Sequence, residues 1–229
     1  MSAISLDAVA EAIGINGLIL RGGFNFEAQE EAPTGPSGGS SRSVVLVGQA
    51  GSAPWPHFLA WRAKQSEDLT NPLDTWSRRV IGDVAARFGA RAVSPSDKPY
   101  LPFQQWAMRA EGLKPSPLGI LMHPTYGLWH AYRGALLFDV EIAFEPLREV
   151  NHLCDACTGK PCLKSCPVDA YSTEGFVYQD CLAHVRGSSG APCRDGGCLD
   201  RNACPYGTEY HYLPEQQAFH MAAFLRAGA

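Results

Sequence analysis

The sequence of 229 residues predicts an α+β protein made of two modules and a closing helix. Two observations support this prediction. Strand-like and helix-like segments alternate over residues 1–147, and all eight cysteines lie between Cys154 and Cys204. We therefore expect a sheet covered by helices over residues 1–147, a compact cysteine-rich module over residues 148–213, and a helix over residues 214–229 that packs back against the body.

The chain begins with a helix and a strand. Apolar residues at Leu6, Val9 and Ile13 recur at helical spacing and predict a short amphipathic helix. A strand with an internal Gly-Gly pair is expected over residues 18–24. The stretch at residues 27–42 is rich in Gly, Ser and Pro, so we expect an exposed, mobile loop there.

Strands and helices continue to alternate after this loop. The β-branched apolar run at residues 43–51 predicts a short strand. An Asn-Pro signal marks the start of the longest helix. Helices are expected at residues 57–64, 72–88 and 103–111, and strands at residues 91–93 and within residues 119–144.

Composition argues against several classes of partner. The chain has 19 Lys and Arg against 23 Asp and Glu, a formal net charge of −4. This balance gives no overall basic footprint for a polyanion, so we do not expect nucleic acid as a partner, although local basic patches stay open. No run approaches about 18 consecutive apolar residues, and the N-terminal segment lacks a basic, apolar leader, so neither a membrane span nor a secretory signal is expected. We expect a cytoplasmic protein.

The first four cysteines follow a cluster-binding pattern with one longer gap. Cys154, Cys157, Cys162 and Cys166, with Pro167, read C-x2-C-x4-C-x3-C-P. Bacterial ferredoxins have C-x2-C-x2-C-x3-C-P, and the fourth cysteine of that run ligates the other cluster. A tight loop of three thiolates suits three corners of one iron–sulfur cube, and a helical turn carries the fourth thiolate away.

The last four cysteines complete a second ligand set. They end in the same Cys-Pro signature, at Cys204 and Pro205. Four plus four thiolates are the ligand count of two [4Fe–4S] clusters. Crossed ligation, as in ferredoxins, assigns Cys154, Cys157, Cys162 and Cys204 to one cluster, and Cys166, Cys181, Cys193 and Cys198 to the other.

Two other uses of the cysteines stay open at this point. Structural zinc sites also use sets of four cysteines, but they typically show paired CxxC knuckles, whereas this chain has one CxxC and two Cys-Pro ends. Disulfides do not persist in a reducing cytoplasm, which disfavours a disulfide framework. His152, His184 and His211 flank the block, and we interpret them as neighbouring or surface residues because the thiolates already complete both sets.

The cysteine block resembles the iron–sulfur domain of epoxyqueuosine reductases. In that domain CxxCxxCxxxCP is followed by an isolated cysteine and by a closing group that ends in CP, and Cys181 stands where the isolated cysteine would. The gaps after Cys157, Cys193 and Cys198 are longer here. Those reductases are larger and carry tRNA-binding elements, so we do not carry their substrate over to this chain.

A second resemblance involves the segment from Ser116 to Gly134. It resembles the region of CblC-type cobalamin-processing proteins in which an HP-x-[Y/F]-G-x-W motif precedes an R-G strand. This resemblance implies a nitroreductase-like α/β domain with a corrinoid pocket over residues 1–147. The cysteine-rich module would then be a ferredoxin-like domain whose clusters deliver electrons to cobalt.

The residues of this segment also suit a large, flat, partly polar ligand when taken by themselves. Aromatic and basic side chains lie between apolar strands, at His123, Tyr126, Trp129, His130 and Arg133. Arg133 is the best candidate to hold a carboxamide or phosphate. The alternative is an ordinary strand–turn–strand with half-buried aromatic residues.

These features together predict an iron–sulfur redox protein. A redox partner protein would reduce one cluster, the second would relay the electron, and an acceptor near residues 123–133 would receive it. A corrinoid is the leading acceptor, and the chain would then be a corrinoid-dependent or cobalamin-processing oxidoreductase. The alternative is a ferredoxin-like electron carrier whose N-terminal domain docks a partner enzyme and binds no small molecule.

Overall fold

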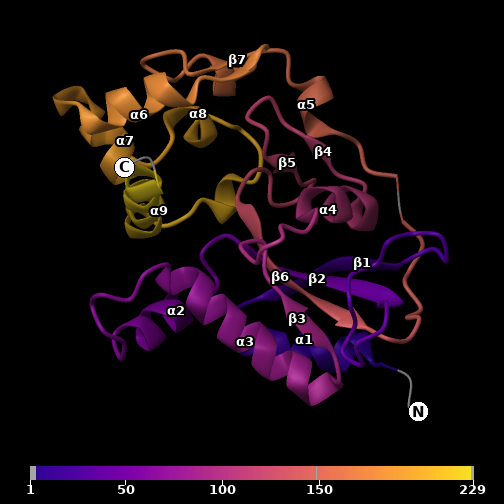
Figure 1. The fold of residues 1–229 in the computed structure, drawn as a ribbon. Coiled ribbons are helices and arrows are strands. Elements are labelled where there is room, and N and C mark those ends of the chain that lie inside the picture. The colour runs from indigo at the N-terminus through magenta and orange to yellow at the C-terminus, as the bar shows by residue number, and fades with distance from the viewer. Residues whose placement is uncertain (1–3, 148, 228–229) are drawn as a thin grey trace. The chain divides into compact units, whose positions relative to one another are not determined.

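The computed structural model describes residues 4–147 and 149–227 (Figure 1). These residues form two compact units. Unit 1 contains residues 4–112, 131–147 and 149, and unit 2 contains residues 113–130 and 150–227. Helices and strands occur in both units, so the α+β class predicted from the sequence is confirmed.

Unit 1 is built on one four-stranded sheet. In sheet order the strands are β1 (Ile19–Asn25), β2 (Ser43–Ala50), β6 (His130–Phe138) and β3 (Arg91–Val93). β1 pairs with β2 and β3 with β6, in both cases antiparallel. β2 is buried along nearly its whole length, which explains its run of β-branched residues. The register of β1 shifts between Leu20 and Gly23, where Gly22 has a φ of +65°.

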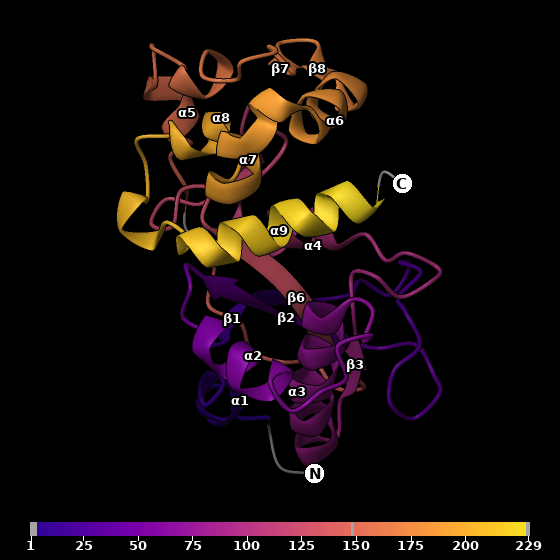
Figure 2. The ribbon, with the colours of Figure 1, turned by 90° about the vertical axis from the view of Figure 1, so that its left-hand side faces the viewer.

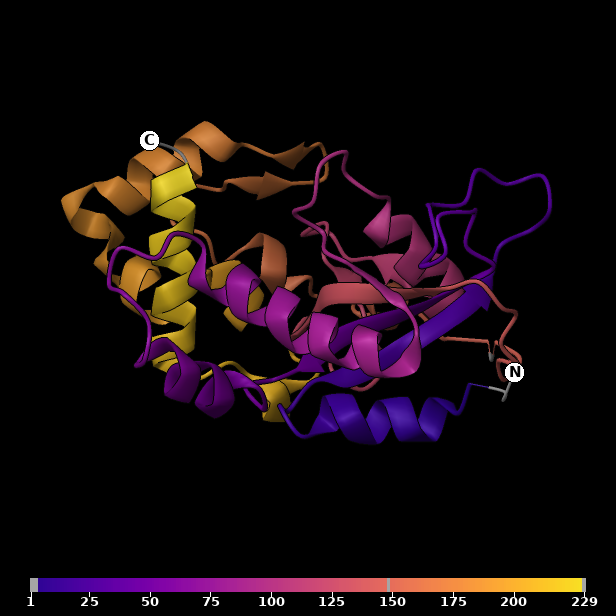
Figure 3. The same ribbon diagram turned by 60° about the horizontal axis from the view of Figure 1, so that its bottom comes forward.

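Helices cover both faces of this sheet. They are α1 (Leu6–Gly14), α2 (Trp55–Arg62), α3 (Pro72–Phe88) and α4 (Phe103–Glu111). Figures 2 and 3 show α1, α2 and α3 on one face and α4 on the other. α2 begins two residues before the start expected from the sequence, because Pro56 occupies its first turn. In the described part of the chain, no helix has the length and apolar character that crossing a membrane requires.

The loop at residues 27–42 is exposed, as the sequence predicts, and hydrogen bonds hold parts of it. Ser41 Oγ donates to the Pro33 carbonyl at 2.8 Å, and Ser37 N donates to Asp139 Oδ2 at 2.9 Å. Arg91, on β3, donates to a loop carbonyl at 2.7 Å. The sheet therefore anchors the loop at more than one point.

A buried ion pair joins the end of α4 to the sheet. Arg21, on β1, is 1% exposed, and its Nε and Nη2 atoms donate to the two carboxylate oxygens of Glu111 at 2.9 and 3.0 Å. Tyr132, on β6, also donates to Glu111, and burial raises the pKa of Tyr132 well above its usual value. The Arg21 guanidinium lies 4.7 Å from the centre of the Tyr132 ring. Three side chains from three elements thus hold one another in place.

We expect Glu111→Gln to lower the free energy of unfolding by about 3 kcal/mol, because it leaves the buried Arg21 guanidinium without its carboxylate. Urea unfolding followed by circular dichroism measures this loss. Glu141→Gln is the matched control, since Glu141 pairs with Arg42 and these side chains are 57% and 55% exposed. A loss below about 1 kcal/mol is expected there. Equal losses in the two variants would contradict the structural weight given to the buried pair.

Unit 2 consists of short helices and two-residue strands, so much of its backbone lies in turns. Its hairpins are β4 (Lys114–Pro115) with β5 (Leu121–Met122), and β7 (Tyr171–Ser172) with β8 (Gly175–Phe176). Its α-helices are α5 (Leu153–Ala156), α6 (Tyr178–Arg186), α7 (Ala191–Gly196), α8 (Leu199–Asn202) and α9 (Pro214–Ala227). Single 3-10 turns occur at Pro161–Leu163, Ser188–Gly190 and Thr208–Tyr210.

Two segments group differently from the domain limits expected from the sequence. Residues 113–130 belong to unit 2, although the sequence analysis placed them in the first module. α9 packs within unit 2 against α7 and α6, and its expected return to the body stays a prediction. The expected limit between residues 147 and 148 falls at residue 148, which lies outside the described residues.

Candidate metal centres

The first set of thiols consists of Cys154, Cys157, Cys162 and Cys204. Burial raises the pKa of Cys154 to about 11, the other three thiols of the set raise it further, and Lys160 lowers it. Burial likewise raises the pKa of Cys204, and Cys157 adds to the effect. Cys204 is therefore close enough to interact electrostatically with cysteines about fifty residues earlier in the chain.

The second set of thiols consists of Cys166, Cys181, Cys193 and Cys198, and all four line one cavity of about 260 Å³. Burial raises the pKa of Cys181 to about 11, and the other three thiols of the set raise it further. Apolar side chains, among them Tyr171 and Phe224, complete the cavity wall. A cavity lined by four thiols is a candidate site for a metal–sulfur group, because thiolates are good ligands for such groups.

The two sets do not mix. Among the described residues, every thiol that shifts the pKa of another thiol belongs to the same set. This grouping matches the crossed ligation expected from the sequence, and ligation itself stays a prediction. Over the same residues, no three His, Cys, Asp or Glu side chains stand close enough to hold one metal ion.

An apolar wall covers the first set. Cys154, Cys162 and Cys204 are buried in one cluster with three residues of the 113–130 segment, namely Leu118, Met122 and Leu128. All three wall residues are at most 5% exposed. This packing gives the physical reason why residues 113–130 group with the cysteines rather than with the sheet.

A buried carboxylate ties the two halves of the cysteine block together. Asp200 is fully buried, and its Oδ1 atom accepts the backbone N–H of Ser165 at 2.9 Å. Burial raises the pKa of Asp200, while the N–H groups of Ser165 and Cys166 lower it. Because Ser165 precedes Cys166 and Asp200 follows Cys198, this one side chain fixes two cysteines of the second set relative to each other.

The predicted histidines are engaged within the 113–130 segment. His123 Nδ1 accepts the backbone N–H groups of Thr125 and Tyr126 at 3.0 and 3.1 Å, and its ring stacks on Tyr126 at 4.1 Å. His130 is buried, and its Nε2 atom lies 2.8 Å from the Leu121 carbonyl oxygen. Each imidazole thus has one nitrogen committed to shaping the turn.

Trp129 belongs to an aromatic cluster around Arg201. The Arg201 guanidinium lies 4.5 Å from the Trp129 ring centre and 4.7 Å from that of Tyr212, and its Nη2 atom donates to the Leu128 carbonyl at 2.5 Å. His211 packs on Trp129 at 4.1 Å. Burial, and then Arg201, lower the pKa of His211, which favours its neutral form. Cation–π contacts of this kind hold the turn against the segment between Cys198 and Cys204.

The Arg201 cluster contains polar atoms that lack partners. Within the described part of the chain, four of its buried nitrogen and oxygen atoms make no hydrogen bond, namely Trp129 Nε1, Arg201 Nε, His211 Nε2 and Tyr212 Oη. A buried polar group without a partner costs about 1–3 kcal/mol, so such atoms usually meet water or a ligand.

Two glycines meet where the turn contacts the cysteine block. A Cβ atom on Gly127 would collide with the Tyr206 carbonyl, and a Cβ on Gly207 would collide with the Tyr126 backbone. Both glycines also have positive φ, +55° and +68°. The two backbones can approach this closely only because neither residue has a side chain.

We expect Gly127→Ala to destabilise unit 2 by several kcal/mol, since the new methyl group collides with backbone in addition to the cost of positive φ. Gly119→Ala is the matched control: Gly119 has a φ of +73° in the same segment, but nothing lies within 4 Å of its Cβ position. Only about 1–2 kcal/mol is expected there. Thermal unfolding measures both, and similar losses would show that backbone contact is unimportant at Gly127.

Arg133 falls in the other compact unit from the four remaining predicted ligand-binding residues. It belongs to unit 1, where its Nε atom donates to Gln49 Oε1 at 2.8 Å. His123, Tyr126, Trp129 and His130 all belong to unit 2. The structure therefore brings together four of the five residues, and a shared ligand for the five stays a prediction.

Sequence reasoning missed Tyr171, Asp200 and Tyr212. Tyr171 lines the cavity of the second set and packs against the buried cluster of the first, and burial raises its pKa to about 12. Nothing in the sequence marks Tyr171 or Tyr212. One feature of the sequence could have indicated Asp200. It forms an Asp-Arg pair between two expected ligands, Cys198 and Cys204, where charged side chains can hold the backbone in place.

Comparison with solved structures finds the same fold in two groups of proteins. A C. elegans B12-trafficking protein, CblC, matches with a TM-score of 0.55 and 13% identity over 96% of this chain and 95% of that one. Epoxyqueuosine reductase crystallised with a tRNA-Tyr stem loop matches with a TM-score of 0.51 and 15% identity over 93% of this chain and 67% of that one. The chain is structurally similar to both.

The chain spans only about half of some of these reductases. The Bacillus subtilis enzyme matches with a TM-score of 0.46 and 16% identity, over 78% of this chain and 52% of that one. No model of a protein family and no curated protein sequence matches the chain. The similarity is thus one of fold.

Proposed function

We propose that the chain binds two [4Fe–4S] clusters, one in each set of four thiols, and relays single electrons. The grouping of the thiols carries this proposal, because each set combines cysteines from both Cys-Pro halves. Thiolates are donors that select iron–sulfur clusters or zinc. The cavity of about 260 Å³ inside the second set is much larger than one ion requires. When bound, such clusters accept and donate one electron at a time.

The chain's own residues would tune the two sites differently. Leu118, Met122 and Leu128 keep water from the first set, and exclusion of water is one of the factors that set a cluster's potential. In the second set, the backbone N–H of Ala170 lies 3.5 Å from Cys166 Sγ, and N–H groups next to sulfur stabilise its charged form. Two unequal potentials would give an electron a direction of travel.

Anaerobically purified protein should contain about eight iron and eight sulfide per chain, and dithionite should produce a paramagnetic signal from reduced clusters. Cys204→Ala should lose about half of the iron and remove the same spectral component as Cys157→Ala. Cys166→Ala and Cys193→Ala should each remove the other spectral component. Iron and sulfide analysis with electron paramagnetic resonance measures these losses.

Circular dichroism of each variant is the control for general unfolding. Loss of the Cys193 component in Cys204→Ala would overturn the crossed pairing but keep the clusters. Stoichiometric zinc without sulfide in the anaerobic protein would overturn the redox function itself and favour a structural metal protein.

As the electron acceptor we propose a corrinoid. Two features support it: the fold is shared with the CblC B12-trafficking protein, and the Arg201 cluster holds buried polar atoms without partners. A corrinoid carries amide side chains around its ring, and these accept and donate hydrogen bonds. The second candidate, an electron carrier that docks a partner enzyme, is favoured by the committed nitrogens of His123 and His130.

Hydroxocobalamin added to the anaerobic protein should change its visible spectrum and saturate near one equivalent. Tyr212→Phe should weaken binding about tenfold, because it removes the partnerless hydroxyl group of the Arg201 cluster. Tyr210→Phe is the matched control, since Tyr210 packs on Tyr126 outside the Arg201 cluster. Intact, reducible clusters with no spectral change would reject the corrinoid and favour the electron carrier.

A further inference from the structure

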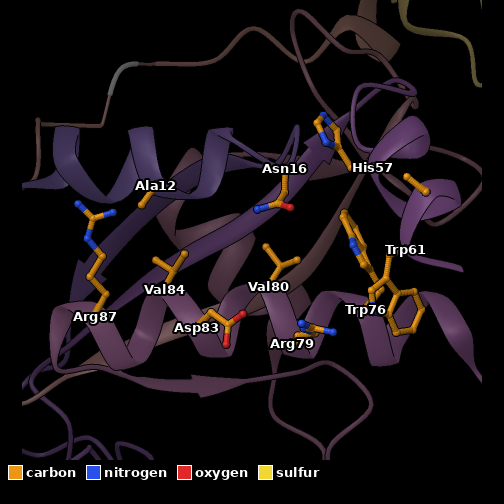
Figure 4. Close-up of a pocket in the computed structure, with 11 residues that line it drawn as sticks. Ala12, Asn16, His57, Trp61, Trp76, Arg79, Val80, Asp83, Val84 and Arg87 are labelled. Atoms are coloured by element: carbon orange, nitrogen blue, oxygen red, sulfur yellow. The ribbon is translucent and has the colours of Figure 1, made fainter. Parts of the chain in front are cut away.

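A groove between α1, α2 and α3 in unit 1 has no part in the proposed electron transfer. Its volume is about 450 Å³, within the range of small-molecule sites. We call it the helix groove; Figure 4 shows the side chains that line it. Its lining includes Asn16, His57, Trp61, Trp76, Arg79 and Arg87.

One end of the helix groove is aromatic and rigid. Trp76, on α3, is 2% exposed, and Phe58 contacts both Trp76 and Trp61, with ring centres 6.0 and 6.3 Å apart. Val80 and Val84 continue the apolar floor along α3. A flat apolar ring therefore finds a preformed wall at this end.

Trp61 lines the helix groove and carries a hydrogen-bond donor that has no partner among the described residues. Its indole Nε1 is buried from solvent and makes no hydrogen bond with any described residue. An indole nitrogen can only donate, so its natural partner is an acceptor atom on a bound molecule or a water.

Positive charge lines the rest of the helix groove. Arg79 and Arg87 lie two turns apart on α3, about 12 Å along the helix axis. Within the described residues neither forms an ion pair, and Asp83 between them is the one lining carboxylate. Arg78, next to Arg79 in sequence, instead pairs with Asp97 at 3.0 Å and is not a lining residue.

We propose that the helix groove binds a small planar aromatic anion of the nucleotide type. The base lies against the Trp61–Trp76 end of the groove. The phosphate lies toward Arg79, whose guanidinium is free to make paired hydrogen bonds with it. His57, on α2, and Asn16, which follows α1, also line this space (Figure 4).

Calorimetric titration of the full-length protein with AMP tests this inference, with adenosine and inorganic phosphate as separate probes. AMP should bind at least about tenfold more tightly than either, since it alone has both the ring and the charge. Arg79→Gln should weaken AMP binding about tenfold or more, because a charge-assisted hydrogen bond is lost. Arg78→Gln is the matched control and should leave AMP binding unchanged.

A second readout locates the ligand. In a nitrogen–proton correlation spectrum, AMP should shift the indole resonance that is missing from Trp61→Phe, and leave that of Trp106 on α4 unchanged. No AMP binding at millimolar concentration would overturn the inference, as would equal effects of Arg78→Gln and Arg79→Gln. Equal affinity for inorganic phosphate would reduce the site to a simple anion site and overturn its nucleotide character.

Discussion

Unit 2 depends on one constraint: two sets of four thiols must each combine cysteines from both ends of one short block. The chain must cross from one set to the other and back. These reversals keep the helices and strands short up to the last cysteine. The structure meets this constraint with single turns and short helices, and with the buried Asp200 carboxylate, whose bond to Ser165 N joins the two halves. α9, the longest helix of unit 2, begins only after Cys204.

The segment at residues 113–130 is the second requirement of this unit. Four of the eight cysteines are buried, and Leu118, Met122 and Leu128 provide the apolar cover for the first set. Arg201 and the glycine contact at Gly127 and Gly207 hold the segment in place. The HP-x-Y-G-x-W motif therefore has a structural use beside the cysteines.

The arginines of unit 1 lie in two kinds of environment. The buried Arg21 is paired with Glu111 and packed on Tyr132, which satisfies a charge that water cannot reach. Arg79 and Arg87, on α3, line the helix groove and form no ion pair with any described residue. A fixed cation holds the fold, whereas an uncommitted cation beside an aromatic wall is available to a ligand.

The sequence by itself determined the α+β class, most of the element order and the eight cysteines, because apolar periodicity and cysteine spacing are local properties of the chain. The ferredoxin pattern also predicts which cysteines share a cluster, and that ligation stays a prediction. Only the tertiary structure decided that residues 113–130 join the cysteines, and that Tyr171 and Asp200 lie beside both sets. These facts rest on contacts between residues far apart in the chain, such as Gly127 with Tyr206, and no local pattern records them.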